Sequence, residues 1–198
     1  MTTICLIRHG ETEWNKVGRI QGTTDVPLNE TGRQQAKACG SHLKEEAWDI
    51  IVTSPLKRAK QTAAIINETM RLPLVEMKEF QEKHFGKVEG MTAEERYGLY
   101  PDKNYPGQEQ PEEFHSRLSK GLAQLNERFG DRRVLVVAHG GVISAILEQL
   151  AHGEYDGEVR LQNGGLNHLA YASERWEIQK YNFIDHLELL ETKANLSH

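Results

Sequence analysis

Three short apolar runs punctuate the chain, at residues 4–7, 50–52 and 134–138. Each run is continuous and does not alternate between apolar and polar positions. Strands that are buried on both faces of a parallel sheet show this pattern, because neither face needs polar side chains. The runs therefore predict three strands in the interior of a mainly parallel sheet.

A helical pattern follows each of these predicted strands. Apolar or small residues recur there at steps of three and four, as one buried helix face requires. The positions are Ala36, Cys39, Gly40, Leu43 and Ala47 after the first strand, Ala59, Ala63, Ile66 and Met70 after the second, and Val142, Ile143, Ile146, Leu147 and Leu150 after the third. This alternation of strand and helix predicts an α/β sandwich.

The segment 82–110 breaks the alternation, because it is polar, rich in Gly and Pro, and without a strong strand signal. We interpret it as a lid-like insertion over one edge of the sheet, within a single domain of residues 1–198. A helix is predicted after it, with Pro111 near its start. The apolar face of this helix holds Phe114, Leu118, Leu122, Leu125 and Phe129.

Two features are predicted near the end of the chain. Residues 167–172 and 176–181 flank a short polar turn, which indicates a hairpin that adds edge strands to the sheet. The last dozen residues are interpreted as a short terminal helix.

Length and charge narrow the class of protein. A chain of 198 residues can bury a core without disulfides, and its two cysteines form no metal-binding pattern. Lys and Arg number 24 against 29 Asp and Glu, a net charge of −5 that disfavours non-specific nucleic-acid binding. With no secretory signal and no apolar run of about 18–20 residues, we expect a cytoplasmic protein that binds neither nucleic acid nor membrane. An exposed edge strand leaves a homodimer open.

Charged and imidazole side chains collect where the predicted strands end. Arg8 and His9 follow the first strand, Arg58 follows the second, and His139 follows the third. Because ligands of open α/β sheets bind outside the carboxyl ends of the strands, we expect these four residues to meet in one crevice. Two guanidinium groups beside two imidazoles suit a phosphate, which the planar fork of arginine matches.

A histidine in a phosphate pocket permits a specific reaction. A neutral imidazole is nucleophilic near pH 7, and its attack on phosphorus gives a covalent phosphohistidine. The departing alkoxide then needs a proton, so a carboxylic acid near the mouth of the pocket is expected. This chemistry requires no metal and no cofactor.

At this point the chain resembles the histidine phosphatase superfamily, the phosphoglycerate mutase-like enzymes. The resemblance lies in motifs that keep their order over about residues 4–171. They are Leu6-Ile7-Arg8-His9-Gly10-Glu11-Thr12 with Asn15, Gly18-Arg19-Ile20-Gln21-Gly22, Asp25-Val26-Pro27-Leu28, Gly32 with Gln35-Ala36, Ser54-Pro55-Leu56-Lys57-Arg58-Ala59 with Gln61-Thr62-Ala63, Glu82-Lys83-His84-Phe85-Gly86 with Glu89-Gly90, and Val137-Ala138-His139-Gly140-Gly141.

The resemblance implies a three-layer αβα sandwich with a mainly parallel mixed sheet and a small insertion that caps the site. It also implies a role for each matching residue. His9 would be the phosphorylated nucleophile, and Glu82 the general acid and then the base. The residues that would hold the phosphoryl oxygens or bind the substrate are Arg8, Arg58, His139, Asn15, Gln21, Gly22, Phe85 and Gly140. Ser54 would orient Arg58.

Members of this family differ in whether water or a sugar-acid phosphate accepts the phosphoryl group. The chain departs from the mutase pattern at Phe85, where mutases have tyrosine, and at Ala93, where they have lysine. No Arg-Arg pair occurs between residues 85 and 130. The first interpretation is therefore a phosphatase for small-molecule phosphate monoesters, closest to the broad-specificity bacterial type. The alternatives are a cofactor-dependent phosphoglycerate mutase and a non-catalytic phospho-ligand binding protein.

Two further points stay open on the sequence alone. Glu79 and Glu89 lie near Glu82, and any of the three could be an ordinary surface acid. The leaving-group side is expected to be aromatic, which would favour bulky or aromatic esters. Its expected lining residues are His84, Phe85, Tyr97, Tyr100 and Tyr105.

Overall fold

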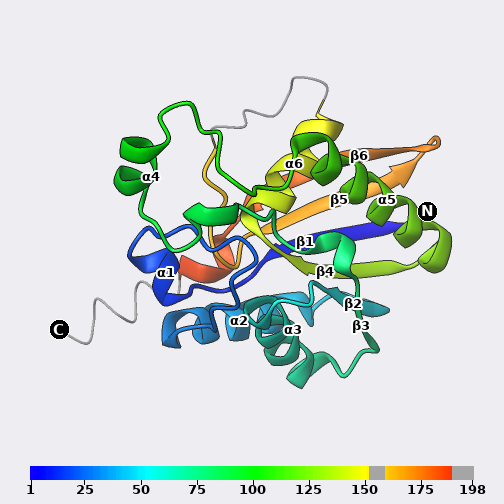
Figure 1. The fold of residues 1–198 in the computed structure, drawn as a ribbon. Helices are drawn as coiled ribbons and strands as arrows, with labels where there is room; N and C mark the ends of the chain where they lie inside the picture. The colour runs from blue at the N-terminus through cyan, green and yellow to red at the C-terminus, as the bar shows by residue number, and fades with distance from the viewer. Residues whose placement is uncertain (152–158, 189–198) are drawn as a thin grey trace.

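A six-stranded sheet forms the middle layer of the computed structural model, which describes residues 1–151 and 159–188. Its strand order is β3-β2-β4-β1-β5-β6 (Figure 1). The parallel strands are β1 (Thr3–Arg8), β2 (Ile50–Thr53), β3 (Leu74–Glu76) and β4 (Arg133–Ala138). The antiparallel strands are β5 (Leu166–Ala172) and β6 (Arg175–Phe183). The mainly parallel mixed sheet is therefore confirmed.

The three predicted apolar runs form β1, β2 and β4, which are neighbours in the sheet. Alternate residues of each strand enter different cores. Ile4 and Leu6 pack with residues of α5 and α6, whereas Cys5 and Ile7 pack with residues of α2 and α3. Burial on both faces explains why the apolar runs are continuous.

Helices cover both faces of the sheet, which gives the three layers (Figure 1). One layer contains α2 (Glu30–Leu43) and α3 (Lys57–Met70), and the other contains α5 (Pro111–Phe129) and α6 (Gly140–Leu150). The predicted apolar face of α5 is buried as expected. No helix within residues 1–151 and 159–188 is both long and apolar enough to span a membrane.

The predicted hairpin is present, with a correction. Ser173 and Glu174 both have positive φ angles, of 50° and 63°, as a two-residue hairpin turn requires. However, β5 pairs with β1 and is an interior strand, so only β6 is an edge strand. The other edge is β3, which the sequence pattern did not indicate, because it has three residues and is largely exposed.

The segment 82–110 contains two short helices joined by loops. These are the 3-10 helix η2 (Gly86–Val88) and the helix α4 (Ala93–Leu99). Figure 1 shows α4 and α1 (Glu13–Lys16) at the end of the sheet where β1 terminates. A third short element, the 3-10 helix η1 (Lys78–Phe80), precedes the segment. Most of the predicted terminal helix falls on residues 189–198, outside the described residues.

The carboxyl end of β1 packs directly against the start of α2. A Cβ atom at Gly10 would overlap the carbonyl oxygen of Gly32, and one at Gly32 would overlap the carbonyl oxygen of Glu11. The two glycines therefore let backbone approach backbone immediately after His9.

We expect Gly32→Ala to lower the free energy of unfolding by about 1–3 kcal/mol, because the backbone of Glu11 cannot yield as a flexible side chain would. Chemical denaturation measures the change. Gly98→Ala is the matched control, since Gly98 lies in α4 with open space around it. We expect the control to be neutral or stabilised by up to about 1 kcal/mol. A Gly32→Ala protein as stable as the control would contradict the close packing.

Candidate active site

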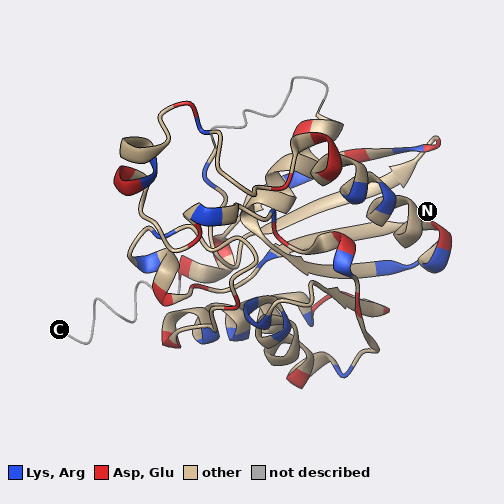
Figure 2. Ribbon diagram, viewed as in Figure 1, with Lys and Arg blue, Asp and Glu red and all other residues tan. Residues whose placement is uncertain are grey.

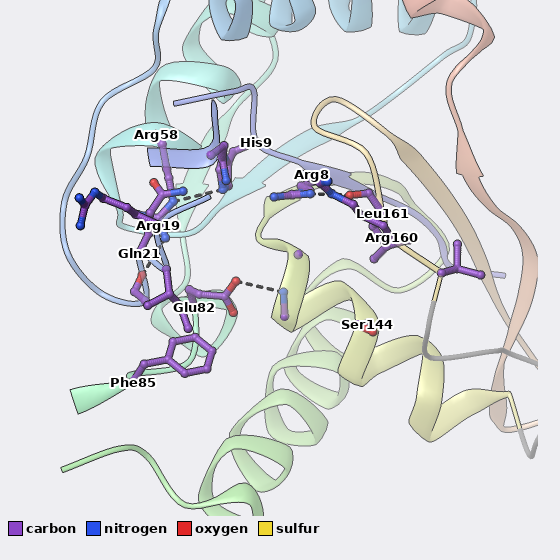
Figure 3. Close-up of a pocket in the computed structure, with 16 residues that line it drawn as sticks. Arg8, His9, Arg19, Gln21, Arg58, Glu82, Phe85, Ser144, Arg160 and Leu161 are labelled. Carbon is purple, nitrogen blue, oxygen red and sulfur yellow. Dashed lines mark hydrogen bonds between the residues drawn. The ribbon is translucent and has the colours of Figure 1, made fainter. Parts of the chain in front are cut away.

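A cavity of about 400 Å³ opens at the edge of the sheet where β1 and β4 end (Figure 3). Nine of the ten predicted site residues line it: Arg8, His9, Asn15, Gln21, Gly22, Arg58, Glu82, Phe85 and Gly140. The tenth, His139, is fully buried, and its ring centre lies 5.2 Å from that of His9. The structure therefore brings all ten together, although their chemical roles remain predictions.

Hydrogen bonds on both ring nitrogens orient His9. Nδ1 lies 2.7 Å from the carbonyl oxygen of Gly10, to which only a protonated nitrogen can donate. Nε2 accepts a hydrogen bond of 3.2 Å from Nε of Arg58, so it carries a lone pair. Burial lowers the pKa of His9 well below its usual value, and the charges of Arg58 and Arg8 lower it further. The imidazole is thus neutral, with its unprotonated nitrogen Nε2 beside Arg58.

Arg58 is buried beside His9 at the start of α3. Its Nη1 donates to the carbonyl oxygen of Thr24 at 2.9 Å, and its Nη2 to that of Gly22 at 2.7 Å. Only 1% of the residue is exposed. Burial lowers the pKa of Arg58, while the negative charge of Glu82 opposes the shift.

His139 contacts the side chain of Ser54, which follows β2. The hydroxyl of Ser54 accepts a hydrogen bond from the backbone amide of Leu56 and lies 2.7 Å from Nε2 of His139, within hydrogen-bond distance. We expected Ser54 to orient Arg58, and this was wrong, because its hydroxyl contacts His139. Burial and the charge of Arg58 lower the pKa of His139 well below its usual value.

Two buried nitrogen atoms at the base of the site have no hydrogen-bond partner within the described residues. They are Nδ1 of His139 and Nε of Arg8. The Arg8 guanidinium lies over Gly140, where α6 begins and where free amides favour an anion. Burial lowers the pKa of Arg8 to about 10, so it still carries its charge at neutral pH. Unpaired buried donors are costly unless a ligand accepts them, and a phosphoryl group supplies such acceptors.

Glu82 faces this base from the opposite wall (Figure 3). Its Oε2 accepts a hydrogen bond from the amide of Gly141 at 3.0 Å, and its Oε1 one from the amide of Lys83 at 2.9 Å. Of the three carboxylates left open by the sequence, only Glu82 lines the cavity. Glu79 contacts Gln124 instead, at 3.4 Å.

Glu89, the third carboxylate, stabilises the loop at residues 22–24, whose carbonyl groups bind Arg58. It accepts hydrogen bonds from the amides of Thr23 and Thr24, each at 3.0 Å, and from the hydroxyl of Thr24 at 2.6 Å. Burial raises the pKa of Glu89, but these hydrogen bonds outweigh burial and hold the pKa below its usual value. The side chain packs where a Cβ atom of Gly22 would lie. We did not predict this role, because the contact joins segments more than 60 residues apart.

Asn163 is a further site residue that the sequence did not reveal. Its side-chain nitrogen donates to the carbonyl oxygen of His9 at 2.9 Å and lies 3.3 Å from Oδ1 of Asn15. Asn15 in turn forms a capping box with Thr12 at the start of α1. Because β5 is antiparallel, the loop before it reaches the edge at which β1 ends.

The outer wall of the cavity is less aromatic than expected. Only Phe85 of the five predicted aromatic or imidazole residues lines it. Tyr105 is buried elsewhere, with its hydroxyl 3.0 Å from Arg96, and Tyr97 is 48% exposed. Arg19 and Arg160 line the wall instead, which makes the cavity more cationic than the sequence suggested.

The positions that departed from the mutase pattern also have clear places. Phe85 lines the cavity without offering a hydroxyl, and Ala93 is an exposed residue at the start of α4. Arg132 and Arg133 lie at the start of β4, at the opposite end of the strand from His139. The arginine pair is therefore remote from the site.

Fold and site together define a histidine phosphatase. The chain belongs to the histidine phosphatase superfamily (branch 1), whose family model matches residues 4–184. It is 50% identical over 188 residues to the uncharacterized phosphatase PhoE of Bacillus subtilis, covering 94% of this chain and 97% of that one.

Two further proteins support this membership. A metal-independent phosphoserine phosphatase of Arabidopsis thaliana is 34% identical over 201 residues, covering 94% of this chain and 84% of the other. A crystal structure of a phosphoserine phosphatase mutant from Entamoeba histolytica in complex with phosphoserine superposes with a TM-score of 0.82 at 28% identity. That match covers 94% of this chain and all of the other.

We expect the protein to lose stability as the pH falls below about 6.5, the ordinary pKa of histidine. The folded state keeps His9 and His139 neutral where the unfolded chain protonates them, so the unfolded state binds more protons. Each ring then contributes a slope of about 1.4 kcal/mol per pH unit.

Urea denaturation of the wild-type protein and of His139→Asn, between about pH 7 and about pH 5, measures these slopes. We expect a shallower slope in the variant. His168 and His186, whose pKa values burial also lowers, contribute to both proteins and cancel in the comparison. Equal slopes would contradict a buried neutral His139.

Proposed function

We propose that this histidine phosphatase hydrolyses small phosphate monoesters through a phosphohistidine at Nε2 of His9. The observation that carries the proposal is the state of this ring: neutral, with Nδ1 committed to Gly10 and the lone pair of Nε2 facing Nε of Arg58, in a cavity that both residues line. An imidazole in this state needs no proton transfer before it attacks phosphorus.

In the first step, Nε2 of His9 forms a bond to phosphorus while the bond from phosphorus to the ester oxygen breaks. The electron pair of that bond stays with the ester oxygen, which takes the proton of a protonated Glu82. In the second step, Glu82 accepts a proton from water, the water oxygen bonds to phosphorus, and the bond between phosphorus and Nε2 breaks. Inorganic phosphate leaves, and both side chains return to their starting states.

Positive charge and N–H donors gather where negative charge develops on the equatorial oxygens. Arg8 and Arg58 supply the charge, and in this proposal Nδ1 of His139, which has no partner among the described residues, carries a proton and supplies a neutral donor. The N-terminus of α6 points its free amide and the positive end of the helix dipole toward the same oxygens. In this proposal Asn15, Gln21 and Gly22 complete the phosphate side, and Phe85 contacts the leaving group.

The surroundings of the cavity support the choice of substrate class. Its volume of about 400 Å³ suits a small molecule, and the segment 82–110, which carries Glu82 and Phe85, would act as its lid. Acidic and basic residues are interspersed over the described helices and form no basic stripe there (Figure 2). Together with the net charge of −5, this favours a cytoplasmic small-molecule ester over a nucleic acid.

We expect His9→Ala to lower kcat by at least about 1000-fold, because no other described side chain that lines the cavity is a neutral imidazole. The variant should still bind inorganic phosphate, measured by calorimetry, because Arg8, Arg58 and His139 remain. Wild-type protein quenched in base after reaction with radiolabelled substrate should carry covalent phosphate, and the variant should carry none. His115→Ala, at a histidine that contacts Gln149 away from the cavity, is the control. Substantial turnover by His9→Ala would exclude the mechanism.

We expect Glu82→Gln to show a leaving-group dependence. For an alkyl phosphate, whose alkoxide needs a proton, kcat/KM should fall about 100-fold or more. For p-nitrophenyl phosphate, whose phenolate leaves unprotonated, it should fall less than about 10-fold. Glu79→Gln is the matched control, three residues away and outside the cavity. Equal losses on the two substrates would point to a different acid.

A further inference from the structure

Arg117, in the second turn of α5, uses every N–H of its guanidinium within the protein. Nη1 donates to the carbonyl oxygens of Glu79 at 2.8 Å and Gln81 at 2.7 Å. Nη2 donates to the carbonyl oxygen of Glu82 at 3.2 Å and to Oε2 of Glu109 at 2.9 Å. Nε donates to Oε1 of Glu109 at 2.6 Å. These are all five donors that an arginine possesses.

Glu109 extends this contact to the other side of the same segment. Its Oε2 accepts from the amide of His84 at 3.2 Å, and its own amide donates to the carbonyl oxygen of His84 at 2.8 Å. Only 24% of the Arg117 side chain and 16% of the Glu109 side chain are exposed, and the guanidinium stacks on Phe114 at 4.8 Å. A bidentate pair in this setting is far more rigid than an exposed ion pair.

The segment that this pair grips, residues 79–84, carries Glu82 in its middle. The two hydrogen bonds that the Glu82 carboxylate accepts fix the position of the carboxylate. The hydrogen bond from Arg117 to the carbonyl oxygen of Glu82 fixes the position of its main chain. Gly121 assists, because α5 approaches so closely that a Cβ atom there would crowd the Cβ atom of Glu79. The pair itself lines a neighbouring cavity of about 530 Å³, which shares Glu82 with the first cavity.

We propose that Arg117 and Glu109 are the positioning pair for the general acid, an inference that rests on the proposed role of Glu82. Neither side chain lines the cavity that holds His9, so both act through the backbone of residues 79–84. Lysine cannot replace Arg117, because three donors on one nitrogen cannot reach three carbonyl groups and a bidentate carboxylate. The pair thus sets how far the carboxyl of Glu82 lies from the leaving oxygen.

The test compares Arg117→Met with Glu82→Gln on the two substrates. We expect kcat/KM for the alkyl phosphate to fall about 10-fold to 100-fold in Arg117→Met, and kcat/KM for p-nitrophenyl phosphate to fall less than about 3-fold. The double variant should lose no more on the alkyl phosphate than Glu82→Gln alone, because the positioning pair has nothing left to position. Arg117→Lys should recover only part of the loss.

The matched control is Arg133→Met, which removes another arginine that pairs with a glutamate and stacks on an aromatic ring, here Glu46 and Trp48, away from the cavity. It reports the effect of lost stability alone, and we expect equal kcat/KM ratios for both substrates. If Arg117→Met fails to fold, Glu109→Gln tests the same pair, since it keeps the size of the side chain and removes its charge. The same selective loss is expected there.

Three results separate this inference from the proposed function. Equal losses on both substrates in the variants of the pair, with a selective loss in Glu82→Gln, would overturn the positioning role alone. An additive double variant would overturn it as well. No selectivity in Glu82→Gln would overturn the acid role of Glu82, on which the inference rests.

Discussion

The rest of the site depends on the burial of the Arg58 guanidinium beside a neutral His9. A buried cation costs several kcal/mol unless its hydrogen bonds are satisfied, and among the described residues no carboxylate forms a hydrogen bond with it. Two backbone carbonyl groups and one imidazole nitrogen satisfy it instead. The loop that supplies the carbonyl groups must therefore be held firmly, and Glu89 holds it with several hydrogen bonds. Burial first, and then the charge of Arg58, lower the pKa of His9 and keep the ring neutral.

The like charges and unpartnered nitrogen atoms of this site lower the stability of the folded protein and raise its affinity for an anion. Arg8, Arg58 and Arg160 all line one cavity. Burial lowers the pKa of Arg8, and the charges of Arg160 and Arg58 lower it further, although the charge of Glu82 opposes the shift. Two buried nitrogen atoms at the base, Nε of Arg8 and Nδ1 of His139, lack partners within the described residues. Bound phosphate would relieve both costs at once, because it brings negative charge and acceptor oxygens together. Strain of this kind is expected at functional sites and is offset by packing elsewhere.

The proposed nucleophile and the proposed acid reach the cavity from different parts of the fold. His9 and His139 follow strands whose ends are aligned by the sheet register, with Arg8 opposite Ala138. Glu82 comes from an irregular segment outside the sheet, which α5 grips through Arg117 and α6 meets at the amide of Gly141. A sheet edge provides a rigid floor, whereas a segment held by side chains can differ between relatives. Differences in that segment would let the same residues at the sheet edge act on phosphate esters with different leaving groups.

The sequence by itself determined three of the four interior strands, the helical layers and the meeting of Arg8, His9, Arg58 and His139. Continuous apolar runs indicate burial on both faces, and parallel strands end at one edge, so local pattern was enough. Only the tertiary structure decided that Glu82, and not Glu79 or Glu89, lines the cavity. It also decided that Asn163 supports His9 and that Ser54 serves His139. These contacts join distant segments through irregular loops, and no periodicity along the chain records which side chains such loops bring together.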